Sequence, residues 1–146
     1  MRCARTAGGG ALFVLVSLLP VAWGCGNNEP SRYDLSGNVS FDGKPVPFGR
    51  IMFDPDTSKQ NTGPQGFADI KDGAYDTANG GVGPIGGPHV IRITGYKSPP
   101  GGSSGVELLF LEQTLKEDLP KEKSTKIFDI PASAAKGVPT GPIAPP

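Results

Sequence analysis

Glycine and proline limit the fold most strongly, because they divide the chain into short apolar runs. The 146 residues include 22 glycines and 16 prolines, a share that approaches the range typical of low-complexity chains. The excess is concentrated in four segments: 26–31, 80–88, 99–105 and 137–146. We therefore expect one small domain at 33–130, between a flexible tether at 25–32 and a loose Pro/Gly-rich tail at 131–146.

Within this domain, apolar and polar residues alternate with the period of a half-buried strand. Asp42-Gly43-Lys44 and Lys71-Asp72-Gly73 are typical of hairpin turns, because glycine tolerates the positive φ that a tight turn needs. The alternation predicts strands at 35–41, 50–53, 66–70, 74–77, 89–96 and 124–130. Short strands separated by turn residues at such intervals predict an all-β sandwich.

The segment 106–118 permits either a strand or a helix. Glu112 and Lys116 are four residues apart, which favours a short helix running to about Lys116. Apolar residues recur there at a spacing that also fits a helix: Leu108, Leu111 and Leu115. Both possibilities stay open at this point.

The N-terminal segment has the order of a secretory signal. Arg2 and Arg5 precede an apolar stretch at 11–19, and small residues around Gly24 follow it. The thirteen residues from 11 to 23 are too few for the roughly 20 that cross a bilayer as a helix. We therefore expect a cleaved signal peptide at 1–24.

The residues Val21-Ala22-Trp23-Gly24-Cys25 resemble the lipobox of bacterial lipoproteins. The resemblance implies that the Cys25 thiol receives a diacylglycerol, that cleavage follows Gly24, and that the new amino group is acylated. Each buried CH₂ adds about 0.8 kcal/mol of membrane affinity, so several acyl chains hold stably. Gly26 stands where some relatives carry Asp, which favours the outer over the inner membrane, facing the periplasm or the cell surface. The alternative is an ordinary signal peptide that precedes a cysteine.

The segment 35–46, LSGNVSFDGKPV, resembles the opening strand and hairpin of carboxypeptidase regulatory-like domains. The segments 49–55, 69–75 and 87–93 resemble later strands of those domains in order and type. The resemblance implies a transthyretin-like β-sandwich of about seven strands, in a lipoprotein similar to those of planctomycete-type bacteria. In metallocarboxypeptidases such a domain is a non-catalytic appendage, so the resemblance implies an accessory role.

Composition disfavours several classes of function. Cys3 and Cys25 are the only cysteines, and processing leaves neither for a disulfide or a cysteine-based metal site. Removal of Arg2 and Arg5 leaves twelve basic against fourteen acidic residues, a net charge of −2, which is no electrostatic footprint for nucleic acid.

Catalytic and metal-binding patterns are weak. His89 is the only histidine, and we interpret it as a strand-edge residue beside an apolar run. No nucleophile-elbow motif accompanies it, and a zinc site needs three or four clustered ligands. The aspartates in the turns match no calcium loop: Asp54, Asp56, Asp69, Asp72 and Asp76. We therefore expect no catalytic residue, no metal and no cofactor.

Tyr33, Tyr75 and Tyr96 are weak candidates for ligand contact, because aromatic rings can stack on sugars. The competing interpretation is a half-buried ring whose hydroxyl group stays in water. The sequence thus predicts a lipid-anchored, non-enzymatic cell-envelope module that contacts an envelope protein or glycan. Two alternatives remain open, namely an envelope hydrolase or metal-dependent enzyme, and a periplasmic carrier of a small ligand.

Overall fold

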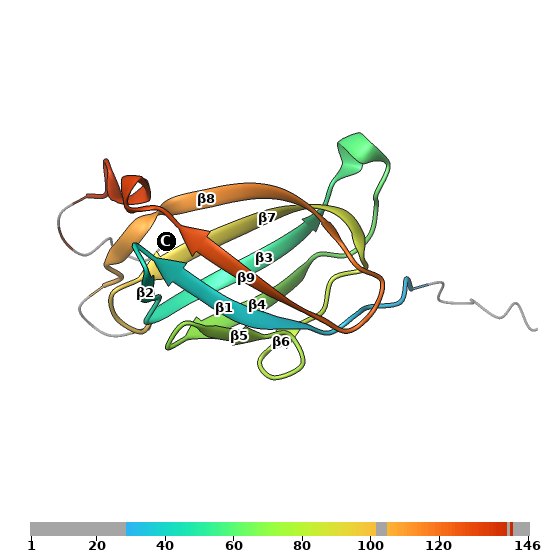
Figure 1. Cartoon of the computed structure of the whole chain (residues 1–146), viewed down its shortest axis with the longest axis horizontal. Helices are drawn as coiled ribbons and strands as arrows, with labels where there is room; N and C mark the ends of the chain where they lie inside the picture. The colour runs from blue at the N-terminus through green and yellow to red at the C-terminus, as the bar shows by residue number, and fades with distance from the viewer. Residues whose placement is uncertain (1–28, 102–104, 140, 142–146) are drawn as a thin grey trace, which may run out of the picture.

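The protein is an all-β domain in the computed structural model, which describes residues 29–101, 105–139 and 141. The six strands expected from the alternation are all present (Figure 1). The strands are β1 (Leu35–Phe41), β2 (Lys44–Pro45), β3 (Phe48–Pro55), β4 (Gly66–Lys71), β5 (Ala74–Asp76), β6 (Gly81–Val82), β7 (Gly87–Tyr96), β8 (Leu108–Leu119) and β9 (Ser124–Ile130). Two 3₁₀ turns, η1 (Thr57–Lys59) and η2 (Ala132–Ala135), complete the described elements.

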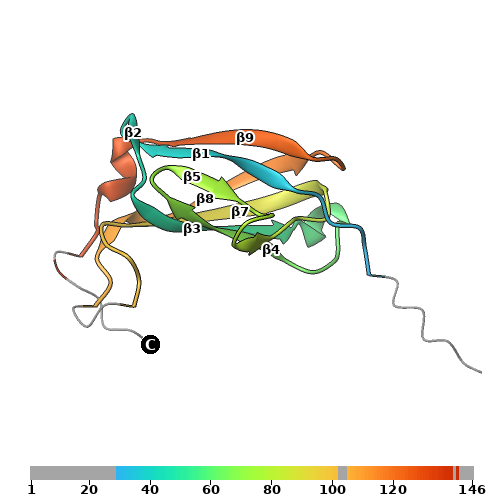
Figure 2. The same cartoon turned by 90° about the horizontal axis from the view of Figure 1, so that it is seen from below.

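The strands form one curled sheet. From β9 the order runs β1, β5, β4, β3, β7 and β8, while β2 pairs with β1 and β6 with β4. Neighbouring strands are antiparallel except β1 and β9, which pair in parallel along seven residues. Figure 2 shows β1 and β9 in one layer and β3 and β4 in the other. The curl therefore brings two layers face to face, as in a sandwich.

The core fills the space between these layers. Alternate residues of β3 and β7 point inward, and Ile51, Phe53, Ile91 and Ile93 have no exposed surface. Tyr75 packs against the rings of Phe53 and Phe128, at centroid distances of 6.3 Å and 6.0 Å. Burial of each such side chain stabilises the fold by about 1.5–3 kcal/mol. A lysine–glutamate pair, Lys126 of β9 with Glu117 of β8, links the two free edges of the sheet.

The helix that was one possibility at 106–118 is wrong, because this segment is strand β8. The register between β7 and β8 shifts after Ile93, which pairs with Gln113, whereas Gly95 pairs with Phe110. This bulge places two β8 residues, Leu111 and Glu112, opposite Thr94. The inward positions change from even to odd numbers across it, from Phe110 to Leu119, while Leu111 lies in the bulge and is exposed, so the helical spacing of the leucines does not mark one buried face.

The register also fixes which strand ends lie together. The segment before β1 lies beside the start of β4, because Arg32 donates to the carbonyl oxygens of Gln65 and Gly83. Lys71, Phe48 and Tyr96 share a row at the other end of β4. In Figure 1 the entering segment lies at the right and the loop after β7 at the left.

The ordered structure continues beyond Ile130, since η2 packs on β8 and its Ala134 is buried. Among the described residues, no helix is both long and apolar enough to span a membrane.

Candidate functional site

The outer face of β4, β3 and β7 carries the side chains that point away from the core. Because successive residues of a strand alternate between faces, residues in register form rows across it. One row contains Lys71, Phe48 and Tyr96. The next row contains Asp69, Arg50 and Thr94. Two aromatic rings therefore lie beside three charged groups at one end of the sheet.

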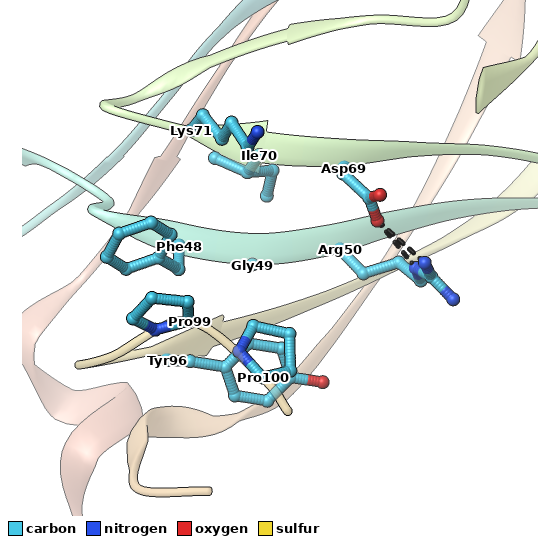
Figure 3. A pocket seen from close by; sticks show the side chains of 9 residues that line it. All are labelled: Phe48, Gly49, Arg50, Asp69, Ile70, Lys71, Tyr96, Pro99 and Pro100. Carbon is cyan, nitrogen blue, oxygen red and sulfur yellow. Dashed lines mark hydrogen bonds and ion pairs between the residues drawn. The ribbon is translucent and has the colours of Figure 1, made fainter. Parts of the chain in front are cut away.

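These rows form the floor of an open groove with a volume of about 380 Å³, which we call the outer-face groove. Pro99 and Pro100, from the loop after β7, form one of its walls (Figure 3). Its volume lies within the roughly 300–1,000 Å³ of small-molecule sites. The lining is Phe48, Gly49, Arg50, Asp69, Ile70, Lys71, Tyr96, Pro99 and Pro100.

The ion pair between Arg50 and Asp69 lies along one side of the groove (Figure 3). The Nε and Nη2 atoms of Arg50 both lie 2.8 Å from the same oxygen, Oδ1 of Asp69. The guanidinium carbon also lies 5.3 Å from the centre of the Phe67 ring, a cation–π contact that fixes its position. Within the described part of the chain, Oδ2 of Asp69 accepts no hydrogen bond.

This ion pair contributes little to the fold. The side chains of Arg50 and Asp69 are 51% and 49% exposed, and exposed pairs stabilise proteins by only about 0–1 kcal/mol. Its remaining hydrogen-bonding capacity, Oδ2 as an acceptor and the guanidinium N–H groups as donors, faces solvent. The pair can thus offer an acceptor and a donor side by side to a ligand.

Lys71 adds positive charge at the end of β4. Its side chain is exposed, and no carboxylate of the described residues forms an ion pair with it. The groove therefore has two cations, Arg50 and Lys71, against one anion, Asp69. Its charge favours an anionic ligand.

The three candidate tyrosines lie in three different places. Tyr96 is half-buried and lines the groove. Tyr75 is only 3% exposed and its hydroxyl donates to the Lys126 carbonyl oxygen at 3.0 Å, so burial raises its pKa. Tyr33 lies near the entry to the sheet, where its N–H donates to the Pro84 carbonyl oxygen. Only Tyr96 has its ring in the groove.

His89 lies inside the sandwich, which corrects the strand-edge interpretation. It is 1% exposed, on a strand that pairs with β3 on one side and β8 on the other. Its Nδ1 lies 2.7 Å from the Gly87 carbonyl oxygen, while Nε2 has no partner among the described residues. The ring is thus fixed by the backbone, away from the outer-face groove.

The turn aspartates serve local structure. Asp56 caps η1, and its Oδ1 accepts hydrogen bonds from the hydroxyl and the N–H of Ser58, which lowers the pKa of the carboxyl group. Asp76 accepts from Asn79 and Ala78, with the same effect on its pKa. Among the described residues, no three acidic, His or Cys side chains are grouped as metal ligands.

Cys25 and Gly24, the expected lipidation and cleavage residues, lie outside the described residues. Comparison with models of known protein families gives no match, and comparison with curated proteins gives none either.

Sequence reasoning identified Tyr96 but missed its neighbours Phe48, Arg50 and Lys71. Alternation places Phe48 and Arg50 on the solvent side of one strand, and Asp69 and Lys71 on that of another. The pairing of those two strands in register is what brings the four side chains together. The alternation alone does not contain that register.

Proposed function

We propose that this protein is a lipid-anchored, non-enzymatic module of the cell envelope that binds or organises a partner there. The observation that carries the proposal is the N-terminal order of basic residues, a short apolar stretch and small residues that end at Cys25. Acylation of Cys25 would tether the mature chain to a membrane, with the outer membrane favoured.

The distance from this anchor to the domain supports a module close to the membrane. Leu35 starts β1 only ten residues after Cys25. Because an extended chain spans at most about 3.6 Å per residue, the tether reaches roughly 35 Å. The domain would therefore stay within the layer next to its membrane.

A transthyretin-like sandwich of the carboxypeptidase regulatory-like type is the fold we propose in finer detail. The β1–β2 hairpin covers the segment that resembles the opening of such domains, and β3 with the β4–β5 hairpin follows in the same order. An accessory, non-catalytic role fits this type of domain. It also fits the position of His89, which the Gly87 carbonyl oxygen holds inside the sandwich.

Detergent partitioning tests the proposed anchor. The full-length protein, expressed in a bacterium with lipoprotein processing, should enter the detergent phase of Triton X-114. The Cys25→Ser variant should move to the aqueous phase, while the control variant Cys3→Ser should behave like the wild type because Cys3 leaves with the signal peptide. Equal partitioning of the wild type and Cys25→Ser would overturn the proposal.

A further inference from the structure

We propose that the outer-face groove binds a carboxylate-bearing glycan, with one pyranose ring against Tyr96. The inference rests on the proposed function and deepens it, because it names the class of partner that the envelope module recognises. Three features of the groove support the inference. They are the aromatic side chains of its floor, the ion pair between Arg50 and Asp69, whose Oδ2 atom accepts no hydrogen bond from the described residues, and the exposed Lys71.

The aromatic side chains of the groove floor supply a surface for the apolar face of a sugar ring. Phe48 and Tyr96 are register partners, and both are half-buried, so part of each ring stays in contact with solvent. Pro99 and Pro100 are exposed and flank the same space (Figure 3). A pyranose presents C–H groups on its face and hydroxyl groups on its rim, and flat apolar side chains match that face.

The ion pair supplies partners for the rim. Oδ1 of Asp69 receives both contacts from Arg50, which leaves Oδ2 and the remaining guanidinium N–H groups for a ligand. A hydroxyl group both donates and accepts, so two neighbouring hydroxyl groups can donate to Oδ2 and accept from Arg50. Hydrogen bonds to charged groups are about twice as strong as neutral ones.

Lys71 selects the charge of the ligand. It lies in the same row as Phe48 and Tyr96, so its ammonium group can reach a substituent of a ring placed there. A proline-rich peptide could also pack against the aromatic and proline side chains of the groove. It would leave Lys71 and Oδ2 of Asp69 without partners, so the polar groups favour a glycan with carboxylates.

The position of the groove fits a surface that faces away from the membrane. The groove lies at the Lys71 end of β4, whereas the tether meets the domain at Arg32, which donates to the Gln65 carbonyl oxygen just before the other end of that strand. The six residues of β4 span roughly 20 Å. A glycan strand could thus reach the groove without approaching the lipid anchor.

Calorimetric titration of the full-length protein in detergent tests the inference. The probes are tetramers of galacturonate, glucuronate and mannuronate, each paired with its carboxyl-reduced, neutral form, at low ionic strength. We expect at least one uronate tetramer to bind more tightly than its reduced form, and added salt to weaken it.

Variants locate the binding site. Tyr96→Ala should weaken the affinity about tenfold, while Tyr96→Phe should keep most of it because the ring remains. Lys71→Ala should remove the preference for the charged tetramer over its reduced form. Tyr33→Ala and Lys123→Ala, a tyrosine and an exposed lysine outside the groove lining, are the matched controls and should bind like the wild type.

Three results would overturn the inference: no binding of any uronate tetramer, equal binding by wild type and Tyr96→Ala, or binding of a proline-rich peptide in competition with the tetramers. Circular dichroism of each variant identifies any loss that comes from unfolding. If Tyr96→Ala unfolds, Lys71→Ala keeps the inference testable, because an unchanged preference for the charged tetramer over its reduced form would overturn it. Detergent partitioning tests the lipid anchor independently of glycan binding. An acylated protein that binds no glycan would therefore contradict the glycan inference and leave the proposed anchor in place.

Discussion

Arg32 and Tyr96 lie near opposite ends of β4: Arg32, where the tether meets the domain, donates to the Gln65 carbonyl oxygen just before this strand, and Tyr96 lies in the row of Lys71, its last residue, where the outer-face groove opens. The pairing of β3 with both β4 and β7 produces this arrangement, because it places Tyr96 in one row with Phe48 and Lys71. A domain of this build can hold an anchor at one end and present a binding surface at the other.

The Arg50–Asp69 pair should matter little for stability. We expect Asp69→Asn to change the free energy of unfolding by less than about 1 kcal/mol, because both partners are half-exposed. Urea unfolding measures this change. A loss of several kcal/mol would show that the pair has a structural role and would weaken the case for a ligand at its free oxygen.

Gly37 should be essential for the parallel pairing of β1 with β9. A Cβ atom at this position would lie 1.7 Å from the Lys126 carbonyl oxygen, and the glycine φ is +155°. Gly37→Ala therefore forces the strands apart, and we expect it to lower the melting temperature far more than Gly80→Ala. Gly80 has a φ of +95° with no atom within 4 Å of its Cβ position, so the control carries only the conformational cost. Similar melting temperatures for the two variants would contradict this account.

Tyr75 should make the fold sensitive to high pH. Burial raises its pKa above that of an unfolded tyrosine, so its contribution is complete below about pH 10 and is lost as the pH rises through the folded value. Tyr75→Phe removes this dependence, and it costs about 1 kcal/mol at neutral pH because the hydrogen bond to Lys126 is lost. Urea unfolding at a series of pH values measures both effects. If the free energy of unfolding falls equally steeply with rising pH in the wild type and in Tyr75→Phe, the result would count against this assignment.

Asp56 should make the fold sensitive to acid. The Ser58 hydroxyl group, its main partner, lowers the carboxyl pKa, and Lys116 and Lys59 add to this effect. A lowered folded pKa gives stability that is present above the unfolded value of about 3.9 and is lost as the pH falls through the folded value. Thermal unfolding below pH 4 should show a shallower acid loss in Asp56→Asn than in the wild type. An identical acid profile would refute the role of this carboxylate.

The sequence predicts the strands with strict alternation better than those whose pattern is interrupted. In β1 and β7 the inward residues recur at every second position, as at Ile91 and Ile93, and the turn glycines mark where the strands end. In β8 the bulge at Leu111 and Glu112 reverses the phase. Leu111 lies in this bulge and is exposed, so the helical spacing of the leucines does not mark one buried face, and the segment pairs with β7 as a strand.

The groove depends on long-range pairing, which limits prediction from sequence. Tyr96 is recognisable as an aromatic residue at a strand end, but Lys71 comes near it only because β3 pairs with both β4 and β7. The burial of Ala134 has a similar cause, since η2 packs on β8, far from it in the sequence. Composition alone indicated a loose tail there.

Intact-mass analysis of the protein purified from bacterial membranes tests the anchored-module account most directly. We expect a mature chain that begins at Cys25 and carries the mass of a diacylglycerol and an amide-linked acyl group, with this mass absent from the Cys25→Ser variant. A soluble chain without acyl mass, cleaved at another site or not cleaved, would contradict the account.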